Sequence, residues 1–174
     1  MNQKKNYTEL RVCIFLLLFL IIALFPATRK IGIDRDSYAY QNDVLRAIQN
    51  NFKNSITSSR EPTFFLITYI SSLIFSDAVR GVLIIYALLA IALKLLSMYK
   101  YSEDIFISLC VYFALFYILH EFTTIRAGVA SGIFLLSYDD IIKKRLKKYV
   151  FKVFIATLFH YSAFVLIICI DLRA

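Results

Sequence analysis

Long uncharged runs of apolar residues are the feature that most limits how this chain can fold. Residues 105–119 and 153–170 contain no charged side chain, and residues 12–28 form a third such run near the N-terminus. A helix needs about 20 predominantly apolar residues to cross the hydrocarbon core of a bilayer. At 60% hydrophobic residues, the 174-residue chain has more apolar side chains than a soluble domain of its size can bury. The sequence therefore predicts an all-α, polytopic transmembrane helix bundle that forms a single domain over residues 1–174.

The number of spans depends on how residues 63–75 are interpreted. That run is uncharged but only 13 residues long, and it includes Thr68, Ser71 and Ser72. It is either a short true span or a helix that stays at the membrane surface. The other five predicted spans are residues 12–28, 81–99, 105–119, 122–138 and 153–170. The bundle therefore has five or six spans. Lys94, near the end of its run, is expected to snorkel to the interface.

The positions of the basic residues predict the orientation of the bundle. Cytoplasmic loops carry an excess of Lys and Arg, and residues 139–152 contain the densest basic cluster, so we place that loop on the cytoplasmic side. The net charge of +8 is interpreted in the same way, and not as a nucleic-acid-binding surface. Counting basic residues alone favours six spans. We nevertheless prefer five, because the family resemblance described below favours that number.

The polar segment 29–61, which follows the first run, is predicted to contain an amphipathic helix. Apolar residues recur there at every fourth position, namely Tyr40, Val44, Ile48 and Phe52. Polar residues occupy the opposite side, as in helices that lie on a membrane surface. Either Asp36 or Ser37 would cap the start of this helix. With residues 63–75 as a possible second member, we expect one or two interfacial helices after the first span.

Two candidate functional sites lie near the two ends of this polar segment. Asp34 lies shortly after the first span, where the carboxylates either belong to a helix cap and a solvated, self-neutralising loop or supply a general base. Asp36 is the alternative base. Arg60 is a candidate for holding a phosphate, and Glu61 is assigned to the same substrate-binding site. The alternative is that Glu61 and Pro62 only mark a helix start, where the helix dipole favours a carboxylate.

Two further candidates lie inside apolar runs, where charged and polar groups are costly. Arg126 either snorkels to the interface or uses its planar guanidinium to bind an anion such as a diphosphate. His160 is either a buried, hydrogen-bonded side chain or a group that transfers a proton near pH 7. The only other histidine is His120, and the chain has no HxxxH or CxxC pattern. We therefore expect no metal site, and no nucleotide-cofactor motif is present.

Four short patterns occur in a particular order along the chain. They are Asp34 with Tyr38, Glu61-Pro62, Arg126 with Ala130, and the sequence Phe159-His160-Tyr161-Ser162-Ala163 after the basic loop. In this order they resemble the EpsG family of bacterial exopolysaccharide and capsule membrane proteins, which are similar to Wzy-type polymerases. The last pattern is the most specific. The chain departs from the family at Ala127, where Gln is common. Family members are usually longer, so we expect the chain to correspond to the N-terminal half of the family.

The resemblance implies a glycan polymerase, and thus a possible glycosyltransferase, in the bacterial cytoplasmic membrane. Its donor would be a growing glycan on a polyprenyl diphosphate, and its acceptor a hydroxyl of a lipid-linked repeat unit. Asp34 or His160 would be the catalytic base. The substrate-binding residues would be Tyr38, Arg60, Glu61 and Arg126, with the two arginines beside the diphosphate. Other expected partners are membrane lipids and further polysaccharide-assembly proteins.

Two other functions remain open at this point. A flippase or transporter of the same pathway would use its intramembrane charges to move a substrate. Transporters favour broken helices and internal repeats, so four Gly, two Pro and no visible repeat argue mildly against this function. The remaining possibility is an inactive truncated fragment or a scaffold subunit. The product distinguishes the first two, because a polymerase lengthens the glycan and loss of a flippase leaves lipid-linked single units inside the cell.

Overall fold

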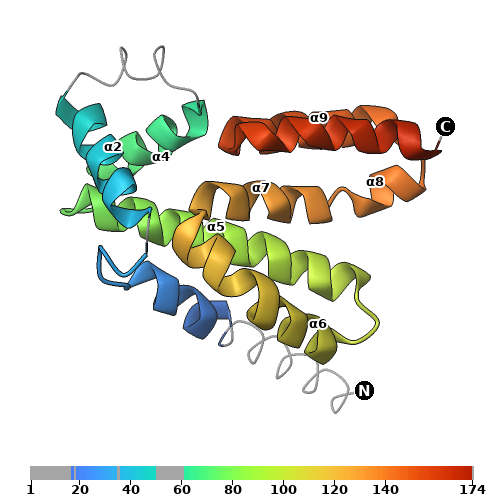
Figure 1. Ribbon diagram of the computed structural model, residues 1–174, viewed down its shortest axis with the longest axis horizontal. Helices are drawn as coiled ribbons and strands as arrows, with labels where there is room; N and C mark the ends of the chain where they lie inside the picture. Colours follow the sequence, from blue (N-terminus) through green and yellow to red (C-terminus); the bar gives the residue numbers. More distant parts are fainter. Residues whose placement is uncertain (1–16, 18, 35, 50–60, 174) are drawn as a thin grey trace, which may run out of the picture.

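The computed structural model describes Leu17 and residues 19–34, 36–49 and 61–173, and these residues form helices and short connections (Figure 1). Arg60 and Phe52 lie outside the described residues. The first helix covers residues 19–27. It is followed by α2 (Ser37–Gln49), α4 (Pro62–Ile74), α5 (Ala78–Tyr101), α6 (Ile105–Val111), the π-helix η1 (Tyr112–Thr123), α7 (Ile125–Leu135), α8 (Tyr138–Ile142), α9 (Leu146–Phe159) and the 3₁₀-helix η2 (Tyr161–Arg173). The all-α prediction is confirmed.

Two of the described helices are long and apolar enough to cross a membrane. They are α5 and the continuous helix Ile105–Thr123 that α6 and η1 form together. An aspartate side chain caps the N-terminus of each helix. Asp77 accepts a hydrogen bond from the backbone N–H of Arg80, and Asp104 accepts hydrogen bonds from those of Phe106 and Ile107. The shorter apolar helices α4 and α7 fall below this length. The predicted five or six spans are therefore not confirmed.

The predicted span 153–170 is not a single helix, so that prediction is wrong. Helix α9 ends at Phe159, and His160 has an extended backbone with φ −154° and ψ 120°. The chain then reverses, and η2 runs back beside α9 (Figure 1). The hydroxyl of Tyr149 donates to the carbonyl of Leu166 at 2.6 Å across this hairpin. Hydropathy does not detect the reversal, because every side chain around it is uncharged.

Helix α2 forms where the four-residue apolar spacing predicts it. Its buried face, which includes Tyr40, Val44 and Ala47, packs in the protein core, whereas Ile48 is 41% exposed. Ser37 does not cap the helix end. Instead, its hydroxyl accepts the N–H of Gly32 and donates to a carbonyl in the preceding turn, which closes that turn. Gly32 has φ +98°, a conformation that other residues rarely adopt.

Several helix ends meet at one end of the bundle, on the left in Figure 1. The guanidinium of Arg80, at the start of α5, donates to the carbonyls of Thr28 and Arg29 at 3.1 and 3.2 Å. Arg29 in turn donates to the carbonyl of Glu121, near the end of η1, at 3.2 Å. The end of the first helix, the start of α5 and the end of η1 are therefore held together, and α7 starts from the same end.

Candidate active site

Three residues that are far apart in the sequence meet at helix ends. Glu61 directly precedes α4, whose first residue is Pro62, and its extended backbone leads the chain into that helix. Arg126 is the second residue of α7, after the break at Thr124. His160 occupies the tip of the hairpin between α9 and η2. We call Glu61, Arg126 and His160 the helix-end cluster.

The Glu61 carboxylate joins the other two members of this cluster. One oxygen, Oε1, lies 2.8 Å from Nδ1 of His160, and the other, Oε2, lies 2.6 Å from Nη1 of Arg126. An ionised carboxylate only accepts hydrogen bonds, so this contact assigns a proton to Nδ1 of His160, and in the neutral imidazole Nε2 then carries the lone pair. The Glu61 side chain is 9% exposed, whereas those of Arg126 and His160 are 29% and 34% exposed. The carboxylate is thus enclosed, while the imidazole and the guanidinium are accessible.

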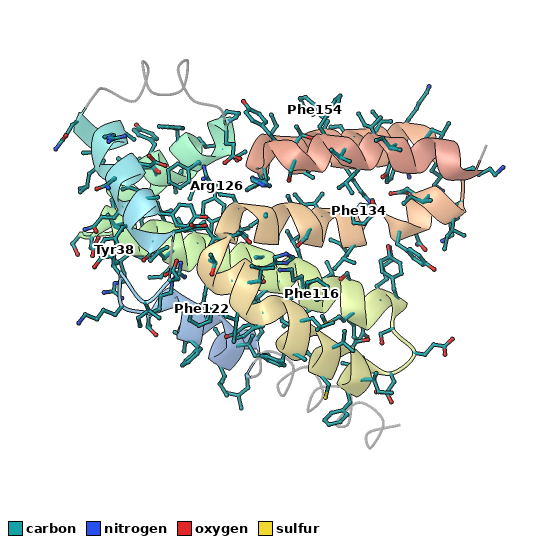
Figure 2. All side chains as sticks on the ribbon, viewed as in Figure 1. Tyr38, Phe116, Phe122, Arg126, Phe134 and Phe154 are labelled. Atoms are coloured by element: carbon teal, nitrogen blue, oxygen red, sulfur yellow. The ribbon has the colours of Figure 1, made fainter. Side chains whose placement is uncertain are left out.

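Aromatic rings hold the guanidinium of Arg126 in place. It lies 5.2 Å from the ring centre of Tyr40 and 5.3 Å from that of Phe64, which is cation–π geometry (Figure 2 labels Arg126). The hydroxyl of Tyr40 donates to the carbonyl of Thr123 at 3.0 Å. Burial raises the pKa of Tyr40, although the nearby charge of Arg126 partly opposes this, so the phenol remains a neutral donor. Helices α2, α4 and α7 together fix the orientation of this arginine.

The hairpin tip is attached to α4 by a separate contact. The hydroxyl of Thr63 donates to the carbonyl of Leu158 at 2.7 Å, two residues before His160. The ring of Phe159 packs edge-to-face against Tyr86 of α5 at 6.3 Å. These contacts hold the backbone on the N-terminal side of His160, so the imidazole position is set by packing as well as by Glu61.

Asp34 belongs to a different ion pair from the helix-end cluster. Its Oδ1 accepts from Nε of Arg29 at 3.2 Å, and the two side chains are only 5% and 1% exposed. Burial lowers the pKa of Arg29, and the charge of Asp34 opposes this effect. Arg29 also donates to the carbonyls of Pro26 and Glu121. The two predicted catalytic residues therefore have different partners: Asp34 pairs with Arg29, and His160 pairs with Glu61.

The remaining predicted site residues have different surroundings. Tyr38 is 60% exposed on α2. A side-chain carbon on Gly32 would meet its hydroxyl at 2.5 Å, so the phenol lies close to that turn. Arg60 directly precedes Glu61 in the sequence but lies outside the described residues. Among the described residues, no group of three or more His, Cys, Asp or Glu side chains is arranged to hold a metal ion.

The structure contains a second cluster of charged groups that the sequence did not predict. Lys94 forms an ion pair with Oε1 of Glu121, and its Nζ lies 3.3 Å from Nδ1 of His120. The hydroxyl of Tyr112 donates to the same glutamate oxygen at 2.8 Å. We call these four residues the buried cluster, since the side chains of Lys94 and Glu121 are only 3% and 1% exposed. The expectation that Lys94 snorkels is therefore wrong. The available signal was a pair of opposite charges, with Lys94 inside one apolar run and Glu121 just after the next.

Comparison with known proteins identifies the family. The sequence model of the EpsG family matches residues 12–172, which is nearly the whole chain. No match was found among curated proteins or among solved structures. The matched range includes the four patterns that carry the resemblance, and with them the whole helix-end cluster. The chain therefore belongs to the EpsG family, which places it among membrane proteins of polysaccharide biosynthesis.

Proposed function

We propose that the protein is a glycan polymerase that joins repeat units carried on polyprenyl diphosphate. The helix-end cluster is the observation that supports this proposal most strongly. It combines an accessible imidazole, whose other nitrogen is bound by a carboxylate, with an accessible guanidinium that shares the same carboxylate. A reaction that takes a proton from a hydroxyl and releases a diphosphate needs both of these groups.

The proposed reaction is a substitution at the anomeric carbon of the donor sugar. The acceptor hydroxyl oxygen forms a bond to that carbon, and the bond from the carbon to the diphosphate oxygen breaks. The hydroxyl proton passes to Nε2 of His160, and the diphosphate leaves with the bonding electron pair. Glu61 keeps the imidazole oriented and stabilises its charged form, as the carboxylate does in other His-containing catalytic sites. Arg126 stabilises the negative charge on the leaving group, and Arg60 is proposed to extend the same diphosphate site.

His160 is the preferred proton acceptor because of its exposure. Asp34, the other predicted base, is nearly closed off and already accepts from Arg29. An acceptor sugar has direct access to a side chain that is 34% exposed, as that of His160 is. Asp34 is therefore proposed to act as a structural partner of Arg29. The exposed Tyr38 beside this turn remains a candidate contact for the substrate.

We place the helix-end cluster towards the outer face of the bacterial cytoplasmic membrane. The contacts of Arg29 and Arg80 bring the chain after the first helix to the same end of the bundle as the start of α7, as the five-span arrangement requires. The basic turn between α8 and α9 lies at the opposite end (Figure 1), which corresponds to the cytoplasmic side. The predicted span 153–170 is replaced by the hairpin of α9 and η2, which does not cross, so we place four crossings in the membrane instead of five. The hairpin enters the bilayer from the cytoplasmic side and returns to it.

A transporter or flippase of the same pathway is the second candidate function. The observation that favours it is the break at His160, where a run of apolar residues changes direction at the tip of the α9–η2 hairpin. Broken helices at membrane depth form the substrate sites of many transporters. No glycine or proline marks this break, so a low number of these residues does not exclude a broken helix in this chain.

The two histidines of the chain provide a matched pair of variants for testing these functions. The full chain is expressed in a bacterial strain that makes lipid-linked repeat units but lacks its own polymerase, and glycan length is measured by gel electrophoresis. We expect His160→Gln to abolish chain extension and His120→Gln to retain it, at equal protein levels in the membrane. Normal-length polymer from His160→Gln contradicts the proposal. Single units that accumulate on the cytoplasmic face favour the transporter instead.

A further inference from the structure

A cavity of about 600 Å³ lies between α5, the helix Ile105–Thr123 and α7. Phe116 of η1 and Phe134 of α7 both line it (Figure 2). Its walls also include aliphatic side chains and the rings of Tyr101, Tyr112 and Tyr138. This volume is in the range of cavities that bind small organic ligands. No member of the helix-end cluster lines the cavity, so it is a separate site.

The buried cluster closes one end of this cavity. Lys94, His120 and Ser131 contribute polar atoms there, and Ser131 already donates to the carbonyl of Gly128 at 2.8 Å. The charge of Lys94 is neutralised by Glu121. An additional anion at this end would have to compete with Glu121 for the lysine, which is unfavourable for a pair this deeply buried. A ligand that reaches this end of the cavity therefore has to present an uncharged, mainly hydrocarbon group there.

The wall formed by Ile105–Thr123 faces away from the protein on its other side. Phe106, Leu115 and Ile118 are 74%, 65% and 70% exposed there. This helix is one of the two that are long and apolar enough to cross a membrane. Exposed apolar side chains on a membrane-crossing helix contact lipid chains. A lipid chain is thus the hydrocarbon that lies beside the cavity in the protein's own environment.

Positive charge lies at the opposite end of the cavity. The rings of Tyr101 and Tyr138 contact each other at 5.5 Å, and Nζ of Lys100 lies 4.8 Å from the ring centre of Tyr101. Lys100 and Lys143 both form ion pairs with Oδ2 of Asp139, at 3.4 and 3.1 Å. Two cations share one carboxylate, so these three side chains together carry a net positive charge, and both lysines are about half exposed. Such lysines attract anionic lipid headgroups.

From these observations we infer that the cavity holds one acyl chain of an anionic phospholipid. The chain extends between Phe116 and Phe134 towards the buried cluster. The headgroup phosphate lies beside Lys100 and Lys143, which is the cytoplasmic end in the orientation proposed above. The inference does not depend on polymerase activity, because none of these residues belongs to the helix-end cluster.

The absence of tryptophan from the chain allows a direct test of this lipid site. The full chain carrying Phe134→Trp is purified in detergent and titrated with phosphatidylglycerol whose acyl chains are brominated, which quenches nearby tryptophan fluorescence. We expect saturable quenching at about one lipid per protein. The matched control is Phe154→Trp, because Phe154 is 59% exposed on α9 and does not line the cavity. Parallel quenching of the two tryptophans over the whole titration overturns the inference.

Two further sets of measurements test the parts of the site separately. Combined Lys100→Gln and Lys143→Gln substitutions should raise the lipid concentration for half-quenching by about fivefold for each lysine. Brominated phosphatidylcholine should bind the protein with both lysines intact about as weakly as phosphatidylglycerol binds the double variant. Equal binding of the two lipids to the protein with both lysines intact overturns the headgroup assignment. Ser131→Phe, which fills the inner end, should remove saturable quenching. Phe116→Trp on the opposite wall replaces Phe134→Trp if circular dichroism shows that the latter does not fold.

Discussion

The helix-end cluster and the buried cluster use nearly the same side chains in different settings. Each combines a glutamate, a cation and a histidine, with Glu61, Arg126 and His160 in one and Glu121, Lys94 and His120 in the other. The first lies where helices begin or reverse, and two of its members are about one-third exposed. The second lies within helices, and its ion pair is almost completely enclosed. Exposure and backbone position, and not residue type, therefore separate a candidate reactive site from a structural one.

The physical reason for this difference lies in the backbone. Inside a helix the peptide groups are already hydrogen-bonded, so side chains at the interface of two helices can only pack or pair with each other. At a helix end the chain changes direction, which leaves space for side chains to face outwards. Lys and Glu within apolar helices are stable only as a pair, since each alone would be an uncompensated charge.

The largest expected effect is on catalysis, from Glu61→Gln. The amide can keep a hydrogen bond to His160, but it removes the charge that stabilises the imidazolium. We expect glycan extension to fall by about 10²–10⁴-fold. The protein should remain folded, because glutamine is similar in size to glutamate. Polymer yield at matched protein level measures the effect, and an unchanged yield removes Glu61 from the proposed machinery.

In the buried cluster, Lys94→Met is expected to lower the stability of the protein, whereas Glu61→Gln leaves it folded. This change leaves the carboxylate of Glu121 without its cation, which costs about 3–5 kcal/mol of stability in comparable buried pairs. Thermal unfolding in detergent and the level of protein in the membrane measure the loss. The double variant Lys94→Met with Glu121→Gln should recover much of it, since no unpaired charge remains. Equal stability of the single variant and the unchanged protein would disprove a structural role for the pair.

Arg126→Lys is expected to have a smaller effect. Lysine keeps the charge but loses the planar set of donors that contacts Glu61 while leaving other N–H groups for a phosphate. The loss of one charge-assisted hydrogen bond, worth about 1.5–3 kcal/mol, corresponds to a reduction in glycan extension of about tenfold or more. Arg80→Lys is a suitable control, because the guanidinium of Arg80 donates to the backbone carbonyls of Thr28 and Arg29. Full activity of Arg126→Lys would mean that the arginine serves only as a surface charge.

The smallest effect concerns the close contact between the helices that carry the two clusters. A side-chain carbon added at Gly128 of α7 would lie 2.8 Å from the backbone carbonyl oxygen of His120. Because a backbone atom cannot move aside easily, Gly128→Ala should cost about 1–3 kcal/mol of stability. Unfolding of this variant and of Ala127→Gly, its neighbour in the sequence, can be compared by circular dichroism. A stable Gly128→Ala variant would show that α7 and η1 are less closely packed than described.

The sequence by itself determined the helical class, the membrane environment and the family. These depend on composition, on apolar spacing and on short patterns, all of which are local properties of a chain. The same local signals predicted α2, the start of α4 at Pro62, and Arg126 and His160 as candidate residues. Pro62 illustrates why this works, since its fixed φ angle and missing N–H favour the first turn of a helix in any surroundings.

Only the tertiary structure decided which of these residues meet. Glu61 and His160 are 99 residues apart, and nothing in either local sequence indicates that they share a hydrogen bond. The same is true of Asp34, whose pairing with Arg29 depends on the turn between them. Hydropathy also failed at His160, because it averages over side chains and cannot register a reversal of the backbone within an apolar run. Contacts between distant helix ends depend on how whole helices pack, and that information is distributed over the entire chain.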